Sequence, residues 1–302
     1  MGDLLFVNDL FPKDWRSYFV GRDTDYLKAP SDAIQVALFP GPFDLDIVYT
    51  PQFDPDRYLC GERISYWNPA LGRRSGRDAI ADPVTPDAVF RDDEIALRVR
   101  RTVGGWELAL YGYEGFWKSP EGFDPVSARP RFPALGAYGL SARGGFAGGL
   151  ASLEAGHYDS REDRSGRDPF TPNSQTRALV GYEREAGRDL QVGVQYYVEC
   201  MADHGAYRAT LPAGMRPRDE VRHVMTLRLT RFALNQNLTL SLFLSFSPSD
   251  RDGYLRPAVS YKATDNWLFA TGANLFFGRD DHTFFGQFEK NNNVYAAARR
   301  SF

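Results

Sequence analysis

Few side chains in this sequence are spaced for catalysis or for metal binding. Asp250 and Asp252, followed by Gly253, resemble the first half of a calcium-binding loop, but the distal glutamate is missing, so an ordinary solvated turn is the better interpretation. The histidines have no partner at a metal-ligand spacing; they are His157, His204, His223 and His282. The sequence therefore predicts no catalytic residue, no metal and no cofactor.

The two cysteines are the next candidates for chemistry. Cys60 lies in a long polar stretch, and Cys200 lies at the end of an alternating segment that follows. In an oxidising compartment a disulfide between them could tether that polar stretch. Two unrelated free cysteines are the alternative, since two cysteines in a chain of this length do not form a disulfide framework.

Charged residues at alternate positions of short segments are the candidates for acting on a solute. One parity of the last segments carries a basic set, with no carboxylate of that parity among them: Arg222, Arg228, Arg256, Lys262 and Arg299. The same parity of the earlier segments carries a mixed set: Asp44, Asp46, Glu94, Arg98, Arg100, Glu107, Glu154, Arg177, Glu183 and Glu199. If both sets line one water-filled space, the basic wall favours carboxylate or phosphate groups. Pairing of these bases with acids, as a structural network, is the alternative.

The segments that carry these charges have the period of two that is typical of β-strands. Leucine or phenylalanine occupies every second position from 238 to 246, and the positions between them are mostly threonine or serine. The same alternation recurs from 190 to 199, from 43 to 50, from 94 to 100 and from 255 to 277. Each segment thus has an apolar face and a polar face, which predicts a sheet with water on one side.

Tight and long connections alternate along the chain. Turn-like residues lie at 41–42, 104–105, 143–145, 186–189, 233–237 and 263–266. Longer polar stretches lie between them, at 53–92, 116–132, 159–174, 201–220, 247–253 and 278–291. Bacterial outer-membrane barrels have short periplasmic turns and longer outer loops, and counting back from the last residue places every tight turn on the periplasmic side.

The composition agrees with a barrel and excludes two other classes. The chain is 14% aromatic with a mean hydropathy of -0.43, and it has no run of about 20 apolar residues of the kind a membrane-spanning helix requires. The net charge of -3 argues against a nucleic-acid-binding protein, which is normally basic.

The stretch from Phe53 to Asp92 is the longest segment without strand periodicity. It carries an aromatic part and then an arginine-rich part, whose notable residues are Tyr66, Trp67, Arg73, Arg74 and Arg77. Long loops of this kind are functional or disordered. Two interpretations stay open: a solvated external loop, or a loop that folds into the mouth and places its arginines at a constriction.

The two ends of the chain bear on assembly. The last segment alternates up to Phe302, as in barrels that close on a terminal aromatic residue, so Phe302 is the expected assembly signal. The first residues carry no secretory signal. About thirteen strands are expected by count, and barrels usually have an even number. A rising strand from Leu4 to Phe11 would make the count even.

Four stretches carry a resemblance to a family. They are residues 2–14, 26–31, 49–57 and 286–291. They resemble uncharacterised proteobacterial outer-membrane porin-like barrels, which are distantly similar to alginate-export channels. In that family the opening motif follows several upstream strands, so the resemblance implies that the first hairpins are missing here. Arg300 departs from the family, which usually has an aromatic residue two positions before the last.

The sequence as a whole predicts one domain over residues 1–302, an all-β transmembrane antiparallel up-and-down barrel that lacks its amino-terminal strands. The expected function is an outer-membrane channel of a Gram-negative bacterium for a small polar or anionic solute. The expected partners are outer-membrane lipid, the barrel-assembly machinery and that solute, without nucleic acid.

Two alternatives to the channel stay open. One is a non-conducting structural, adhesive or electron-conduit barrel, and the less favoured one is an outer-membrane lipid hydrolase. A contact across the lumen between large inward residues would favour the non-conducting barrel; the residues are Phe39, Tyr111, Tyr197 and Phe243.

Overall fold

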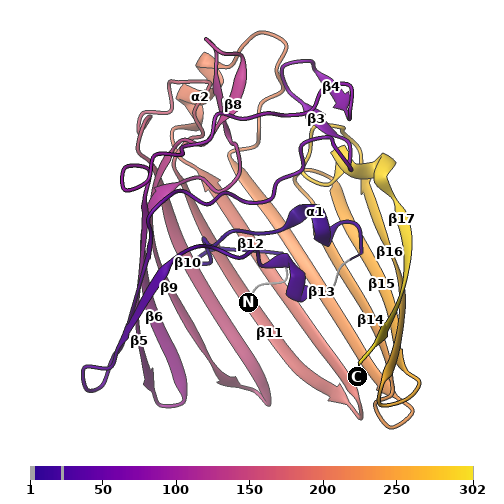
Figure 1. Ribbon diagram of the computed structural model, residues 1–302. Helices are drawn as coiled ribbons and strands as arrows, with labels where there is room; N and C mark the ends of the chain where they lie inside the picture. The colour runs from indigo at the N-terminus through magenta and orange to yellow at the C-terminus, as the bar shows by residue number, and fades with distance from the viewer. Residues whose placement is uncertain (1–3, 22–23, 302) are drawn as a thin grey trace.

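The computed structural model describes residues 4–21 and 24–301, and its main feature is one strongly curved antiparallel sheet (Figure 1). The sheet has 13 strands, each hydrogen-bonded to its neighbours in chain order, which confirms the predicted all-β up-and-down fold and the predicted number of strands. The strands are β1 (Ile34–Leu38), β2 (Asp44–Thr50), β5 (Glu94–Val103), β6 (Trp106–Phe116), β9 (Ala134–Phe146), β10 (Gly149–Ser160), β11 (Gln175–Gly187), β12 (Leu190–Met201), β13 (Val221–Ala233), β14 (Leu238–Ser247), β15 (Asp252–Lys262), β16 (Trp267–Gly278) and β17 (Asn293–Arg300).

The remaining elements are short and lie in the connections. Two small hairpins, β3 (Tyr66–Asn68) with β4 (Arg73–Ser75) and β7 (Gly122–Asp124) with β8 (Arg129–Arg131), project from one end of the sheet together with α2 (His204–Thr210) and η2 (Gly286–Asn291) (Figure 1). We call this the long-loop end and the opposite end the tight-turn end. The helices α1 (Trp15–Tyr18) and η1 (Thr24–Leu27) lie inside the curve of the sheet.

The two faces of the sheet differ as the alternation predicts. In β14, Ser245 and Ser247 are 1% and 0% exposed, whereas Leu240 and Phe246 on the other face are 39% and 38% exposed. Successive side chains of a strand point to opposite faces, so the polar parity faces the concave side and the apolar parity faces outward. We call the concave side the lumen.

The predicted connections hold with two corrections. The predicted connection at 247–253, with its solvated turn, is too long, because Asp252 and Gly253 are buried and belong to β15. Arg143, Gly144 and Gly145 were predicted as a tight turn, but β9 continues through them to Phe146. A side chain at Gly144 would overlap the indole of Trp106, so this glycine accommodates a neighbouring ring instead of turning the chain. The turn itself follows at Ala147 and Gly148, which both have positive φ.

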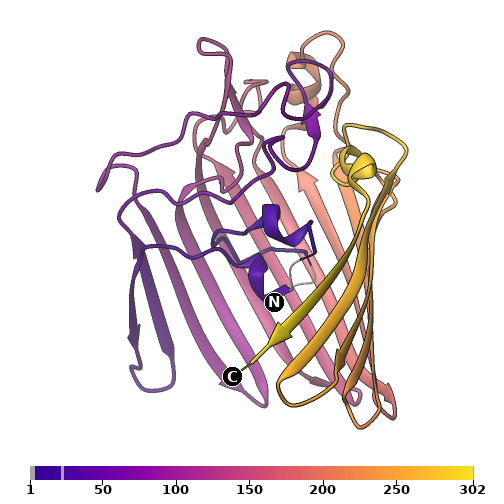
Figure 2. The same ribbon diagram turned by 45° about the vertical axis from the view of Figure 1, so that its right-hand side comes forward.

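The sheet has two edges in the described part of the chain. No ladder of hydrogen bonds joins β1 to β17 there, and Figure 2 shows these two strands on either side of an open front. The predicted assembly signal, Phe302, lies outside the described residues. Of the helices among the described residues, none is long and apolar enough to cross a membrane.

Residues 4–21 cross the lumen from the β9–β13 wall to the β14–β17 wall, and we call them the crossing segment (Figure 2). The prediction of a rising strand from Leu4 to Phe11 is wrong, because this stretch forms no strand. Leu5 and Val7 are buried at alternate positions, but they pack on lumen side chains and not beside a neighbouring strand.

Candidate functional site: the lumen and the segment that crosses it

The first end of the crossing segment packs on the wall formed by β11, β12 and β13. Leu5 and Val7 form a buried cluster with Leu179, Tyr197 and Val224, all of which face the lumen. Removing such side chains from water stabilises the contact by roughly 25 cal/mol per Å² of apolar surface. The segment is therefore held by a hydrophobic contact with the wall.

A pair of facing glycines creates the seat for the next residues. Gly139 of β9 and Gly156 of β10 lie directly opposite each other in the ladder. A Cβ at Gly139 would overlap the Asn8 amide oxygen, and a Cβ at Gly156 would touch Val7. The bare backbone lets Asn8 approach closely enough to donate to the Leu140 carbonyl at 3.0 Å.

The second end of the crossing segment enters an aromatic cluster. Phe19 packs on Phe276 with ring centroids 5.2 Å apart, and on Tyr254 with centroids 5.6 Å apart. Aromatic pairs at this separation are favourable beyond the area that they bury. The buried members of the cluster are Tyr18, Phe19, Leu27, Ile64, Phe243, Tyr254, Phe276, Phe285 and Phe288.

Asp56 fastens the middle of the crossing segment to the loops. Its carboxylate accepts hydrogen bonds from the Lys13 backbone N–H at 2.7 Å, the Trp15 indole N–H at 3.2 Å and the Ser119 hydroxyl at 2.9 Å. Burial raises the pKa of Asp56 because the charged form loses its hydration, although these donors oppose the shift.

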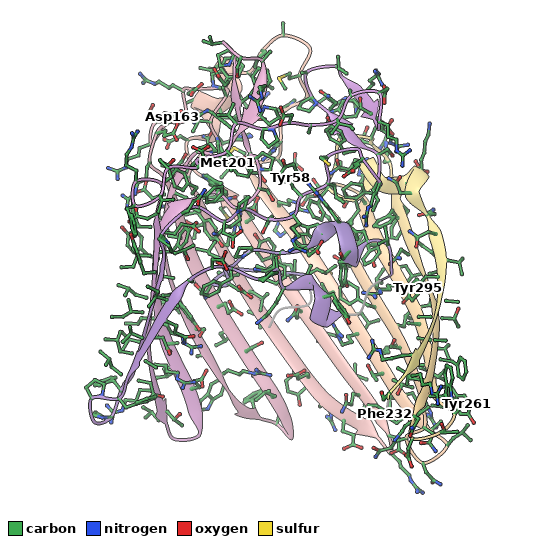
Figure 3. All side chains as sticks on the ribbon, viewed as in Figure 1. Tyr58, Asp163, Met201, Phe232, Tyr261 and Tyr295 are labelled. Carbon is green, nitrogen blue, oxygen red and sulfur yellow. The ribbon has the colours of Figure 1, made fainter. Side chains whose placement is uncertain are left out.

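Two chambers remain in the lumen beside the crossing segment. Chamber 1 has a volume of about 400 Å³ and lies between residues 5–12 and the walls of β1, β2, β5, β6, β9 and β10. Chamber 2 has a volume of about 440 Å³ and lies between Tyr18, Tyr26 and the walls of β13 to β17. Both volumes fall in the range of small-molecule sites. Side chains gather at the long-loop end and around α1, and they are sparser over the concave face toward the tight turns (Figure 3).

The structure places the residues of the predicted basic wall in three different parts of the lumen. Arg228, Arg256 and Arg299 line chamber 2. Arg222 lies nearer the long-loop end and pairs with Asp250 at 2.5 Å, while Lys262 lies at the tight-turn end and pairs with Asp265 at 3.0 Å.

The expectation that the last strands carry no inward carboxylate is wrong. Asp252 belongs to β15 and is fully buried on the lumen side. It accepts hydrogen bonds from the backbone N–H groups of Phe285 at 2.6 Å and Gly286 at 3.3 Å. This carboxylate therefore fixes the connection that contains η2. Neither Asp250 nor Asp252 belongs to a group of metal-ligating side chains among the described residues.

Aromatic rings accompany the arginines of chamber 2. The Arg256 guanidinium lies 4.6 Å from the centre of the Tyr18 ring, and the Arg228 guanidinium lies 5.5 Å from the centre of the Phe243 ring. Such cation–π contacts hold the guanidinium against the ring, while its N–H groups point away from that ring. The Tyr18 contact links the crossing segment to the arginines of this chamber.

Most of the mixed wall forms ion pairs. The nearest N–O distances are 2.8 Å for Arg98 with Asp46, 3.0 Å for Arg100 with Asp44, 3.8 Å for Arg100 with Glu107, 2.9 Å for Arg143 with Glu183 and 3.4 Å for Arg177 with Glu199. Glu154 differs, since its hydrogen bond comes from the Asn8 amide at 3.1 Å and no ion pair joins it to a described residue.

The loop proposed as a constriction lies at the long-loop end of the sheet. Tyr66, Trp67, Arg73 and Arg74 form the β3–β4 hairpin, and Arg77 follows it. Arg74 is fixed by Asp281 at 2.8 Å and by the Gly286 carbonyl at 2.7 Å. The arginines Arg73 and Arg77 contact Asp78 and the Glu62 carbonyl. The crossing segment, not this hairpin, reaches across the lumen at the level of the chambers.

The other predicted residues lie apart from one another. Cys60 is buried, Cys200 is exposed, and both are free thiols. His223 stacks on Tyr196, and its ring nitrogen lies 2.7 Å from the Tyr196 hydroxyl.

The large inward residues do not meet across the lumen. Tyr197 and Phe243 each pack against the crossing segment in separate clusters. Tyr111 bonds to Ser141. Phe39 follows β1 and is 70% exposed.

Sequence reasoning missed the crossing segment as the central element of the site. Its alternating Leu5 and Val7 gave a strand signal, and nothing in its spacing indicates packing on a lumen wall. The one available signal was the pair of glycines, Gly139 and Gly156, at inward positions of adjacent strands, since glycine within a strand marks a close approach of another backbone.

Comparisons with solved structures place the fold among the porins. A porin refined at 1.8 Å resolution superimposes with a TM-score of 0.51 at 12% sequence identity, covering 89% of this chain and 80% of that porin. A triple mutant of the Rhodopseudomonas blastica porin gives a TM-score of 0.43 at 13% identity, covering 93% of this chain and 80% of that one. No protein-family model matches the chain, and no curated protein matches it. At this identity the first comparison shows the fold: an antiparallel porin-like sheet.

Proposed function

We propose that this protein is a porin-like channel in the outer membrane of a Gram-negative bacterium, through which small polar solutes pass without an energy source. The observation that supports this most is the difference between the two faces of the sheet. The outward face offers apolar side chains to lipid, while the lumen face offers hydroxyl, amide and charged groups to water. The porin-like fold agrees with this assignment.

The proposed preference is for anionic solutes, on the side of the lumen that carries chamber 2. Arg228, Arg256 and Arg299 bring positive charge to this chamber, whose other polar lining groups include the hydroxyls of Ser241 and Ser260. A lumen with low-dielectric walls focuses the field of such charges and raises the local concentration of anions. Carboxylate and phosphate groups suit guanidinium donors geometrically as well as electrically.

A solute-flux experiment tests the channel directly. The purified protein is reconstituted into liposomes, and swelling is followed in neutral sugars of increasing size and in sugar acids of matched size. We expect swelling with the small sugars and faster swelling with the acids. A folded, inserted protein that admits none of these solutes would contradict the proposal.

One observation favours the non-conducting alternative. Three buried clusters join the crossing segment and the loops to the lumen wall, and the aromatic cluster around Tyr254 is the largest of them. A barrel filled in this way could serve as a rigid scaffold. The same swelling experiment separates the two functions, because a scaffold admits no solute.

The proposed partners follow from location. The outward face contacts lipid, and the final strand presents its end to the assembly machinery, with Phe302 as the expected recognition residue. Deleting Phe302 should therefore reduce the amount of folded, heat-modifiable protein in the outer membrane. An unchanged amount would remove this role.

A further inference from the structure

We propose that chamber 1 binds zwitterionic solutes, taking the ammonium group at Glu154 and the carboxylate group at Lys28. This assignment names a solute class for one side of the proposed channel and rests on that function for its physiological meaning. The binding itself is an equilibrium property that does not require conduction.

The charges around chamber 1 are the starting point. Asp46 pairs with Arg98 at 2.8 Å, Glu94 pairs with Lys118 at 2.6 Å, and Asp9 pairs with Lys13 at 3.1 Å. These pairs neutralise one another and fix the wall. Among the charged residues that line the chamber, two remain outside this pairing within the described chain: Glu154 and Lys28.

Glu154 is held in place with its charge available to the chamber. It projects from β10 beside the seat of the crossing segment, and its Oε2 accepts the Asn8 amide N–H at 3.1 Å. The Asn8 backbone N–H also donates to this carboxylate, so both of its hydrogen bonds come from neutral donors of one residue. A partly buried carboxylate needs further donors, because removal from water without a partner is costly. An ammonium group supplies both the donors and the opposite charge.

Lys28 approaches the same chamber from a different element. It follows η1, its backbone forms a bridge with Lys13, and its side chain is exposed. The bridge fixes the backbone of Lys28, whereas four flexible methylene groups let the ammonium reach ligands of different length. The lining of the chamber therefore includes one fixed acidic group and one adaptable basic group.

Two opposite charges in the lining of one chamber select a zwitterion over a simple ion. A cation is attracted by Glu154 and repelled by Lys28, and an anion is attracted by Lys28 and repelled by Glu154. Each therefore gains less binding free energy than a solute that carries both charges. The volume of about 400 Å³ accommodates a small amino acid together with some water.

Calorimetric titration of the detergent-solubilised protein tests the proposal. The probes are glycine, γ-aminobutyrate and ε-aminocaproate, with propylamine and propionate as single-charge comparisons. We expect at least one amino acid to bind. The chain length of the amino acid that binds most tightly reports the distance between the Glu154 and Lys28 charges. We expect each single-charge probe to bind on the order of tenfold more weakly.

Charge variants locate the site. Glu154→Gln keeps an acceptor for Asn8 and removes the charge, and Lys28→Met keeps the length and removes the ammonium. Each should weaken binding on the order of tenfold. The exchange variant, with Glu154→Lys and Lys28→Glu, should bind again, because a zwitterion can turn around. Glu183→Gln is the control, since Glu183 pairs with Arg143 and does not line chamber 1.

Several results would overturn the proposal. They are a folded protein that binds none of the amino acids, single variants that bind like the unmodified protein, and an exchange variant that stays inactive although it folds. If the exchange variant does not fold, the two single variants decide alone. The swelling experiment is independent: flux without amino-acid binding refutes this site and keeps the channel, and binding without flux does the opposite.

Discussion

Two residues without side chains determine where the crossing segment lies. Gly139 and Gly156 face each other on adjacent strands, and Val7 and Asn8 occupy the space that side chains would fill. The Tyr158 hydroxyl adds a hydrogen bond of 2.7 Å to the Val7 carbonyl. The seat thus combines close approach with specific hydrogen bonds, so it selects one position for the segment.

Gly139→Val should displace the crossing segment, because its Cβ overlaps the Asn8 amide. We expect the free energy of unfolding to fall by about 1–3 kcal/mol, as for other overpacked sites. Denaturant titration followed by tryptophan fluorescence measures this, and limited proteolysis should cut the segment faster. Gly145→Val is the matched control on the same strand and face, where a Cβ meets nothing within 4 Å. Equal losses in both variants would refute the seat.

Asp56 should make attachment of the crossing segment depend on pH. The pKa of Asp56 is raised in the folded protein. As pH rises above the pKa of the unfolded chain, the unfolded chain loses the Asp56 proton while the folded protein still keeps it. Stability therefore falls as pH rises through the folded pKa. Protection of residues 13–18 in hydrogen exchange, corrected for intrinsic rates, should therefore be greatest in mild acid. Asp56→Asn should remove this component, and Asp124→Asn should not. If the pH dependence of protection persists in Asp56→Asn, another titrating group causes it.

At the scale of elements, Arg74 helps to fasten the β3–β4 hairpin to η2, together with the Trp67 backbone N–H, which donates to the Gln287 side chain at 3.0 Å. Arg74 is 11% exposed and contacts Asp281, Glu289 and the Gly286 carbonyl. Arg74→Ala should release the hairpin at a cost of about 1 kcal/mol, since both carboxylates are half-exposed and screened by water. Arg73→Ala is the control, because Arg73 is 53% exposed. Hydrogen exchange of residues 66–75 measures the release, and identical exchange in both variants would contradict it.

The strands were predictable because a sheet with lipid on one face and water on the other requires period two. That requirement acts on the strands of the large sheet, so the alternation identified β2, β5, β12 and β14 to β17 from sequence. It failed for Leu4–Phe11 because an extended segment lying on a wall of side chains also buries every second residue. Periodicity indicates which face of a segment is apolar, but it does not indicate which part of the protein or of its surroundings covers that face.

The candidate site was less predictable for the same reason. Arg228, Arg256 and Arg299, which parity assigns to the lumen face, line chamber 2. It could not show that Asp250 in a connection reaches Arg222, or that Asp252 begins β15. Contacts between a wall and a loop depend on the path of the loop, and that path has no period in the sequence.

At the scale of the molecule, the crossing segment leaves two chambers of different charge. Reversing charge in chamber 2, by Arg228→Glu with Arg256→Glu, should move the reversal potential in a salt gradient toward cation selectivity, because the field that attracts anions is inverted. Arg188→Glu is the control, since this arginine lies in a tight turn with 96% of its side chain exposed. A conducting double variant with an unchanged reversal potential would remove this wall from the path.

Single-channel recording of the purified protein in a planar bilayer tests the central claim, that the lumen conducts although a segment crosses it. We expect discrete current steps that are larger in Gly139→Val, where the crossing segment is displaced, and unchanged in Gly145→Val. A folded, heat-modifiable protein that inserts and gives no steps would contradict the account and identify the molecule as a closed scaffold.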